Sequence, residues 1–510
     1  MFLFPIQSES LVTLILAERI KYLLAIPLLL PIGITIIYRL YAHPLRDIPG
    51  PRLAAVSDFY AFYYNYFEDG YTKKIQKFHK LYNSPVVRIG PAHVHVNEPS
   101  IFEEIFRMGT RYEKYPAFYK YFGGLEKFIE SKDHRTYRRH LASLYSSKSI
   151  DTLVPRLLTD LHIVGERLQR SLERKQAVSL ERLFRTLATD LILQILLPHD
   201  VNMFEFEGYH PFLESYDTVM DKVWLFLTYP LAEKVLRLCP GSENRKYTAA
   251  ARTLEKYFAS WFNEGQQART SGKSPQRDSH VTRYLEMDTA DHQKVRAVNH
   301  PLNDIFDFIA GGRDPVTHAM SCAFYYLLKT PSSLSKLQAE LSEADSFIRY
   351  NFDHKQIQTL PYLSAVVRET LRLSSPIPGC LPRVVPEHGM NMGSIYLPPG
   401  TAISVSILAV HQNNKMFPEP EDFLPERWLG DKGKSLGKWN VAFSRGPHQC
   451  IGMNLAIFEI YSCIAYLFSR FEFVLANSPD EELQWVDKMI AQNSVDVKVR
   501  ITKDLWADGI

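Results

Sequence analysis

The sequence predicts a mainly helical fold with small β-sheets, and three observations support this prediction. Long segments carry apolar residues at three- and four-residue intervals, as in Arg156–Leu172, Leu180–Leu196 and Ala249–Phe262. Pro85–Pro99 alternates apolar and polar residues around a Gly-Pro turn, which is typical of a β-hairpin. No repeat or shift in composition follows residue 52, so we expect residues 53–510 to form one large domain.

An apolar segment near the N-terminus is expected to anchor the chain in a membrane. Tyr22–Tyr38 contains no charged residue, and as a helix it would span about 25 Å of the roughly 30 Å hydrocarbon layer. Leu40–Ala42 extends the segment. We therefore expect a short leading segment at residues 1–21 and a single transmembrane helix at residues 22–42. A cleaved signal peptide is the rival, but acidic residues precede the segment and no small-residue cleavage site follows it.

The residues that follow the anchor are expected to form a stiff hinge. The stretch "HPLRDIPGPR", residues 43–52, contains three prolines and a glycine, which cannot continue a helix. Basic residues on this side of the anchor favour a cytosolic catalytic domain: Arg39, Arg46 and Arg52.

Further elements follow the same rules. Asn263–His280 is polar and rich in Gly, Ser and Gln, which predicts a surface loop. Leu302–Leu328 is a long apolar segment that predicts a buried helix, and Pro331 begins another helix. Thr401–Leu408 is expected to be a short strand.

Composition excludes several classes of protein. The net charge of +3 is too small to indicate nucleic-acid binding. The five cysteines are odd in number and widely spaced, and they form neither a CxxC pair nor a Cys/His zinc pattern. A disulfide framework is therefore not expected, and a reducing compartment is favoured.

The stretch "FSRGPHQCIG", Phe443–Gly452, surrounds Cys450 with groups that favour negative charge. Gly446 and Gly452 allow backbone N–H groups to approach the thiol, and a helix is predicted to begin nearby. His448 and Arg445 would add positive potential. A stabilised thiolate suits either a nucleophile or a ligand of haem iron, whereas a purely structural cysteine does not explain these neighbours.

The spacing Phe443-x-x-Gly446-x-x-x-Cys450-x-Gly452 resembles the haem-binding signature of the cytochrome P450 family. The family usually has arginine where this chain has His448. The resemblance implies the triangular cytochrome P450 fold with haem b bound through Cys450. The stretches "YRLYAHPLRDIPGP" and "KFHKLYNSPVVRIGP" resemble fungal, membrane-anchored members of secondary metabolism, of the trichodiene-oxygenase type.

Three further stretches match the family in the expected order. Glu369 and Arg372 share a helix face, and the stretch "FPEPEDFLPERW" supplies Arg427. The resemblance implies a buried network of these three residues that supports the haem side. The third stretch is "DHRTYRRH", Asp133–His140, with His134 where the family usually has tryptophan. The resemblance implies that the haem propionates contact His134 and Arg138 of this stretch, together with Arg383 and His448.

The chain departs from the family on the predicted Leu302–Leu328 helix. It reads Gly311-Gly312-Arg313-Asp314-Pro315-Val316-Thr317, with Pro315 where the family has an alcohol. Proline removes the N–H that would bond the Gly311 carbonyl, so we expect a kink or an opening there. The resemblance gives Asp314 the acidic role, and we hypothesise that water held by the Gly311 carbonyl and Thr317 delivers protons.

The resemblance implies a monooxygenase that inserts one atom of dioxygen, by hydroxylation or epoxidation, into an apolar terpenoid or polyketide intermediate. Two alternatives remain: a haem-thiolate isomerase or dehydratase that does not use dioxygen, which the missing alcohol allows, and a non-enzymatic haem sensor. The residues expected to line the substrate pocket are Tyr115, Phe118, Phe122, Ile309, Ile377 and Leu381.

The chain has no flavin or nicotinamide fingerprint, so NADPH electrons are expected to come through a separate reductase. A basic face near the thiolate would attract it, formed by Lys432, Lys434, Lys438, Arg445, Arg135 and Arg139. A solvated loop without a partner is the alternative. The resemblance implies a monomer, held by a single span in the endoplasmic reticulum membrane, with its catalytic domain in the cytosol.

Overall fold

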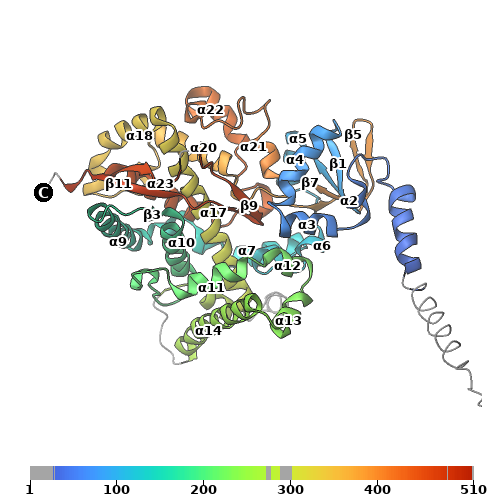
Figure 1. The fold of residues 1–510 in the computed structure, drawn as a ribbon, viewed down its shortest axis with the longest axis horizontal. Helices are drawn as coiled ribbons and strands as arrows, with labels where there is room; N and C mark the ends of the chain where they lie inside the picture. Colours follow the sequence, from blue (N-terminus) through green and yellow to red (C-terminus); the bar gives the residue numbers. More distant parts are fainter. Residues whose placement is uncertain (1–26, 28, 271–276, 288–300, 479, 508–510) are drawn as a thin grey trace, which may run out of the picture.

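Helix α17 (Pro301–Lys329) crosses the middle of the molecule and organises the fold (Figure 1). The computed structural model describes residues 27, 29–270, 277–287, 301–478 and 480–507. Helix α17 packs against the helices α10 (Leu180–Leu196), α20 (Pro361–Ser374) and α23 (Met453–Arg470). The remaining helices of this helical part are α9 (Val154–Glu173), α11 (Pro211–Met220), α12 (Val223–Thr228), α13 (Leu231–Leu238), α14 (Ser242–Thr270), α15 (His280–Leu285), α18 (Pro331–Glu343) and α19 (His354–Ile357).

Shorter helices surround the principal sheet and the Cys450 loop. They are α2 (Arg52–Val56), α3 (Phe59–Phe67), α4 (Tyr71–Leu81), α5 (Pro99–Phe106), α6 (Pro116–Tyr119), α7 (Ser131–Leu141), α8 (Ser147–Asp151), α21 (Ile407–His411) and α22 (Gly430–Leu436). Single turns of 3-10 or π type complete the set: η1 (Tyr38–Ala42), η2 (Gly124–Lys127), η3 (Ala142–Tyr145), η4 (Met203–Glu205), η5 (Ser346–Tyr350), η6 (Pro425–Trp428), η7 (Gly437–Trp439) and η8 (Gly446–His448).

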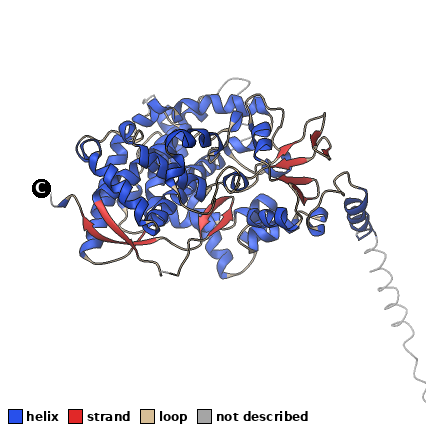
Figure 2. Cartoon of the chain, turned by 90° about the horizontal axis from the view of Figure 1, so that it is seen from above, coloured by secondary structure: helices blue, strands red, loops and turns tan. Residues whose placement is uncertain are grey.

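The strands form small separate sheets at the edges of the helical body (Figure 2). The largest sheet has the order β1-β2-β7-β4, in which β2 and β7 run parallel and the other pairs antiparallel. Its strands are β1 (Val86–Gly90), β2 (His93–Val96), β7 (Ala402–Ser404) and β4 (Arg383–Val384). The other sheets pair β3 (Val178–Ser179) with β11 (Lys498–Asp504) and β8 (Phe471–Leu475), β9 (Trp485–Lys488) with β10 (Ile490–Asn493), and β5 (Met390–Met392) with β6 (Ile395–Leu397).

The apolar residues gather in two main cores. The larger core lies where α9, α10, α17, α20 and α23 meet, and it includes Leu161, Phe184, Phe324 and Ile464. The second core lies under the four-stranded sheet and includes Val94, Ile403 and Trp428. The helical periodicity of the sequence therefore places α17 between apolar faces on several sides, which buries most of its residues.

Most of the predicted elements are confirmed. The β-hairpin is β1 and β2, and the periodic segments Arg156–Leu172 and Leu180–Leu196 correspond to α9 and α10. The chain is mainly helical with small sheets, as predicted. Residues 43–51 form turns and irregular structure rather than a helix, while their role as a hinge stays a prediction.

The structure differs from the expected elements at three places. Asn263–Thr270 continues α14 instead of forming a loop, because Glu264, Gln266 and Gln267 favour a helix and extend one that is already formed. Of Thr401–Leu408, only Ala402–Ser404 is a strand, and the Ser406 side chain caps α21 directly afterwards. Helix α17 is continuous through Pro315, so the helix does not open into a loop at this proline.

The predicted anchor at residues 22–42 lies partly outside the described residues. Residues 29–37 are helical and lead into η1. Within the described part of the chain, no helix combines the length and apolarity that a membrane span requires.

Candidate functional site

The Cys450 loop is a tight turn whose shape depends on glycine. Gly446 has a φ of +67°, and a Cβ added there would lie 2.1 Å from the Phe106 carbonyl oxygen. The Cys450 N–H donates to the carbonyl of Phe443 at 2.9 Å, which closes the loop. Helix α23 begins three residues after the thiol, at Met453. Phe443, Gly446 and Gly452 thus hold Cys450 beside the N-terminus of α23.

Cys450 is an exposed residue, and desolvation of its thiol raises the pKa. The Gly452 N–H and the charge of Arg138 oppose the effect of burial and lower the pKa. Arg445 and His448 were also expected to add positive potential, but Arg445 pairs with Glu103 at 3.5 Å, and burial lowers the pKa of His448 far below its usual range.

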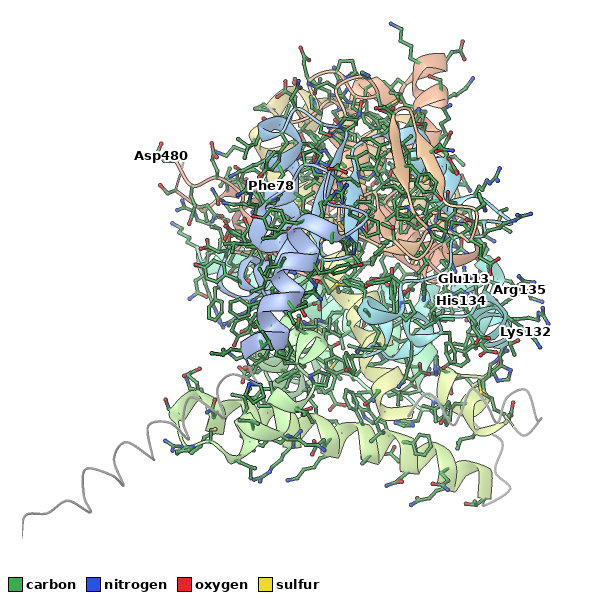
Figure 3. The ribbon with its side chains drawn as sticks, turned by 90° about the vertical axis from the view of Figure 1, so that its right-hand side faces the viewer. Phe78, Glu113, Lys132, His134, Arg135 and Asp480 are labelled. Carbon is green, nitrogen blue, oxygen red and sulfur yellow. The ribbon has the colours of Figure 1, made fainter. Side chains whose placement is uncertain are left out.

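The two histidines that replace the family's usual residues lie together. The ring centroids of His134 and His448 are 4.1 Å apart. Burial lowers the pKa of His134 to about 3, with further effects from Lys114 and Arg138. His134 points inward from α7, whereas its neighbour Arg135 projects from the surface (Figure 3). The helix therefore presents a neutral ring to the interior and a cation to solvent.

Several buried polar nitrogens in this region lack a protein partner, and they include N–H donors. Both ring nitrogens of His448 and the Nε of Arg383 have no hydrogen-bond partner among the described residues. Buried polar groups are normally satisfied, so such atoms indicate a ligand with acceptor oxygens. Propionate carboxylates fit these donors together with Arg138, and the thiol of Cys450 fits iron. The residues present therefore suit a haem.

Lys114 belongs to the same region, although it was not among the residues expected from the sequence. Its ammonium is fully buried, pairs with Glu126 at 2.9 Å and donates to the Leu125 carbonyl at 3.0 Å. It contributes to the lowered pKa of both His134 and His448. No sequence signal marked it, because a lysine between Glu113 and Tyr115 resembles any surface cation.

One face of α17 is accessible although the helix lies in the middle of the molecule. Asn303 and Gly311 are exposed and Asp307 and Pro315 are partly exposed, at successive four-residue intervals. A Cβ added at Gly311 would meet no atom within 4 Å. A stripe with this spacing lies on one side of a helix, so it lines the space on that side. We call these four residues the accessible stripe.

The adjacent Gly312 serves packing instead. A Cβ at this position would lie 2.6 Å from the Cγ1 of Ile192, so glycine allows α17 to approach α10 closely. The two consecutive glycines thus have different roles, one toward the accessible space and one toward the core.

Asp314 is held in a buried ionic network. Its Oδ1 accepts from the Nε of Arg313 at 2.7 Å, and the Nη2 of Arg313 contacts Asp217 at 2.6 Å. Asp217 also pairs with Arg185 at 3.0 Å. Thr317 is buried, and its hydroxyl has no hydrogen-bond partner among the described residues. It lies about 120° around the helix from Gly311. The structure therefore does not bring Thr317 onto the accessible stripe.

The residues expected to line a pocket fall into two groups. Phe118 and Phe122 are partly exposed, with ring centroids 5.5 Å apart, and Tyr115 precedes them at the start of α6. Ile377 and Leu381 are partly buried against the second core. Ile309 differs, because it is fully buried within the larger core on another face of α17.

The structure brings Glu369, Arg372 and Arg427 together. Arg372 contacts both carboxylate oxygens of Glu369 at 2.8 Å, and the Nε of Arg427 contacts Oε1 at 3.0 Å. The carboxylate also accepts from the Trp428 indole at 2.8 Å and from the Leu424 N–H at 3.0 Å. These bonds join α20 to η6, so the network ties two distant segments of the chain.

Comparison with known proteins identifies the family. The family model "Cytochrome P450" matches residues 51–500. The chain is 45% identical to "Cytochrome P450 monooxygenase cloA" of Claviceps purpurea, over 93% of this chain and 94% of that protein. It is 37% identical to "Cytochrome P450 monooxygenase phqM" of Penicillium fellutanum, over 91% and 88%.

A solved structure shows the same fold. The structure titled "Crystal structure of cytochrome P450DA heme domain" superposes with a TM-score of 0.70 at 16% identity, covering 90% of this chain and 97% of that one. With the family model, the relatives and a thiol loop suited to iron in agreement, the chain belongs to the cytochrome P450 family of haem-thiolate monooxygenases.

Proposed function

We propose that the protein inserts one atom of dioxygen into an apolar secondary-metabolite intermediate, such as a terpenoid or a polyketide. The observation that carries this proposal is that Cys450 and the accessible stripe of α17 are both accessible, although α17 lies in the middle of the molecule (Figure 1). Haem supplies the oxygen chemistry when it is bound. The protein binds and orients the substrate and excludes water.

We assign the haem-holding roles to named side chains. Cys450 is the iron ligand, and Arg138, Arg383, His134 and His448 hold the propionates. Phe443, Gly446 and Gly452 shape the loop around the sulfur. Glu369, Arg372 and Arg427 support the thiolate side without contacting the substrate. Partial exposure of Tyr115, Phe118, Phe122, Ile377 and Leu381 supports their assignment to the pocket wall.

Proton delivery is assigned to the backbone near Pro315. Because proline has no N–H, the Gly311 carbonyl lacks the partner that a helix normally provides, and it can hold a water on the accessible stripe. Asp314 would act through its ionic network, and Thr317 through a further water. Thr317→Val tests the last assignment: unchanged product yield per NADPH consumed removes Thr317 from the pathway.

Electrons would come from NADPH through a reductase. The exposed cations Lys432, Lys438, Arg135 and Arg139 support a docking face on the thiolate side. Lys434 is weaker support, since it pairs with Asp431 at 3.0 Å. Residues 22–42 would anchor the protein in the endoplasmic reticulum membrane, with a monomeric catalytic domain in the cytosol.

The test begins with the reduced carbon monoxide spectrum of the purified protein. The wild type should show the red-shifted band of sulfur ligation, and Cys450→Ser should lose it. Incubation with reductase, NADPH and extracts of candidate intermediates should then give products that gain one oxygen, labelled when heavy-isotope dioxygen is used. Pro315 gives one reason to keep a second candidate, a rearrangement without dioxygen. A product of unchanged mass formed without NADPH would establish that alternative.

A further inference from the structure

Asp307 is the one carboxylate on the accessible stripe of α17. It lies one turn before Gly311, so both residues face the same space. Its Oδ2 accepts a hydrogen bond from the Gly123 N–H at 2.5 Å. Gly123 lies near the end of the aromatic segment of residues 111–124, which carries Phe118 and Phe122. Asp307 therefore stands where this segment meets α17, beside the proposed pocket wall.

The charge of Asp307 is not compensated within the described part of the chain, where no ion pair includes it. Burial raises the pKa of Asp307 to about 7, with smaller rises from the carboxylates of Asp304 and Glu126 included in that value. The Gly123 N–H and the charge of Lys127 act in the opposite direction and only partly offset these effects. A carboxylate in such surroundings is costly to ionise unless a cation joins it.

Asp314, two turns further along the same helix, shows the opposite arrangement. Arg313 contacts its Oδ1 at 2.7 Å, so a buried cation within the protein balances that carboxylate. The protein thus supplies its own cation where an acid faces the core. Among the described residues, no cation contacts Asp307, which lies on the accessible stripe, although Asp307 has an oxygen left to bind a donor.

We propose that Asp307 binds a protonated amine, and that the substrate is an apolar compound carrying one basic nitrogen. This inference rests on the proposed function, because it concerns the same pocket. An ammonium N–H would donate to the carboxylate while the apolar body of the substrate contacts Phe118 and Phe122. The nitrogen would then fix the orientation of the substrate over Gly311, where a small residue leaves room.

The experiment uses two probes of equal shape: a dimethylaminoethyl-naphthalene and its carbon isostere, in which CH replaces the nitrogen. Their binding to the haem-loaded protein is measured by calorimetry. The wild type should bind the amine at least about tenfold more tightly than the isostere. Asp307→Asn retains an oxygen for the Gly123 N–H but has no charge, and it should bind the two probes equally.

A second arm varies pH and a third controls for surface charge. Amine affinity of the wild type should rise between about pH 6 and about pH 8, as Asp307 ionises while the amine stays protonated, and Asp307→Asn should show no rise. Asp221→Asn removes an exposed carboxylate outside the pocket and should behave as the wild type.

The outcomes separate this inference from the proposed function. If the wild type shows no preference for the amine, or if Asp307→Asn keeps the preference, Asp307 only fastens the Gly123 backbone and the inference is wrong. The carbon monoxide spectrum is recorded on the same samples. Absence of the sulfur-ligated band overturns the proposed function, whereas a normal band without amine preference overturns the inference alone.

Discussion

The ring of His134 lies 4.1 Å from the ring of His448, so residues from α7 and from the Cys450 loop form one buried pair. Neither ring is charged in the protein alone, since burial lowers the pKa of both. The pair therefore offers a propionate neutral N–H donors, while Arg138, Lys114 and Arg383 supply the positive charge.

This arrangement predicts that His448 governs haem retention. His448→Ala removes a ring whose nitrogens have no protein partner and whose one N–H can donate to a propionate, so haem transfer to apomyoglobin should become about tenfold to a hundredfold faster. His162→Ala, an exposed position on α9, is the matched control and should leave the rate unchanged. Equal rates in both variants would remove His448 from the propionate site.

Removing the charge of the buried Glu369 should lower the free energy of unfolding more than removing the charge of an exposed carboxylate. Glu369→Gln leaves Arg372 and Arg427 buried without their anion, and the free energy of unfolding should fall by about 3–5 kcal/mol. Glu426→Gln breaks the exposed pair with Lys336 and should cost about 0–1 kcal/mol. Denaturant unfolding measures both, and similar losses would contradict a special role for the buried network.

Pro315 is predicted to destabilise α17, because it leaves the Gly311 carbonyl on the accessible stripe without a helical N–H partner. Pro315→Ala restores an N–H for the Gly311 carbonyl, so the free energy of unfolding should rise by about 1–3 kcal/mol. The control is Pro331→Ala, because proline in the first turn of α18 interrupts no bond and its removal should change little. A fall in stability on Pro315→Ala would show that the surroundings of α17 are built around proline.

Gly446 is expected to tolerate no side chain. Gly446→Ala would force a Cβ against the Phe106 carbonyl in a left-handed backbone, so haem incorporation should fall and the unfolding midpoint should drop. Gly437→Ala places its Cβ in open space within a right-handed turn and should be neutral or stabilising by about 0.4–1 kcal/mol. The two variants are compared by absorbance and thermal unfolding.

His411 predicts a loss of stability in acid. Its Nε2 accepts from the Val441 N–H at 3.0 Å, and burial lowers its pKa to about 3. Between its ordinary pKa near 6.5 and this value, only the unfolded chain binds the proton, so stability falls as the pH drops.

The expected slope from this one residue is up to about 1.4 kcal/mol per pH unit. Between about pH 6.5 and about pH 5, the unfolding free energy of His411→Asn should fall less steeply with decreasing pH than that of the wild type, by up to that slope. This difference should appear even if the variant is less stable at neutral pH. A slope identical to that of the wild type would mean that His411 does not titrate on unfolding.

Sequence periodicity was sufficient for elements such as α9, α10 and α17, because each buries a regular apolar face. It failed for Asn263–Thr270, where helix-forming polar residues extend α14, and for Leu408, which lies in a helix that Ser406 caps. Around Cys450, motif spacing located the loop and the Glu369 network. Contacts between distant segments determine the rest, and no local pattern encodes them. They set the pairing of Arg445, the burial of Lys114 and the lack of an ion pair at Asp307 among the described residues.

The parallel pairing of β2 with β7 joins residues 93–95 to residues 402–404. While the chain emerges from the ribosome, the first hairpin must therefore wait for most of the polypeptide before its neighbouring strand exists. Until then its edge backbone groups remain open to wrong partners, which exposes the nascent chain to aggregation. Long-range closure of this kind slows folding, so we expect the yield of native protein to depend on synthesis rate and chaperone supply.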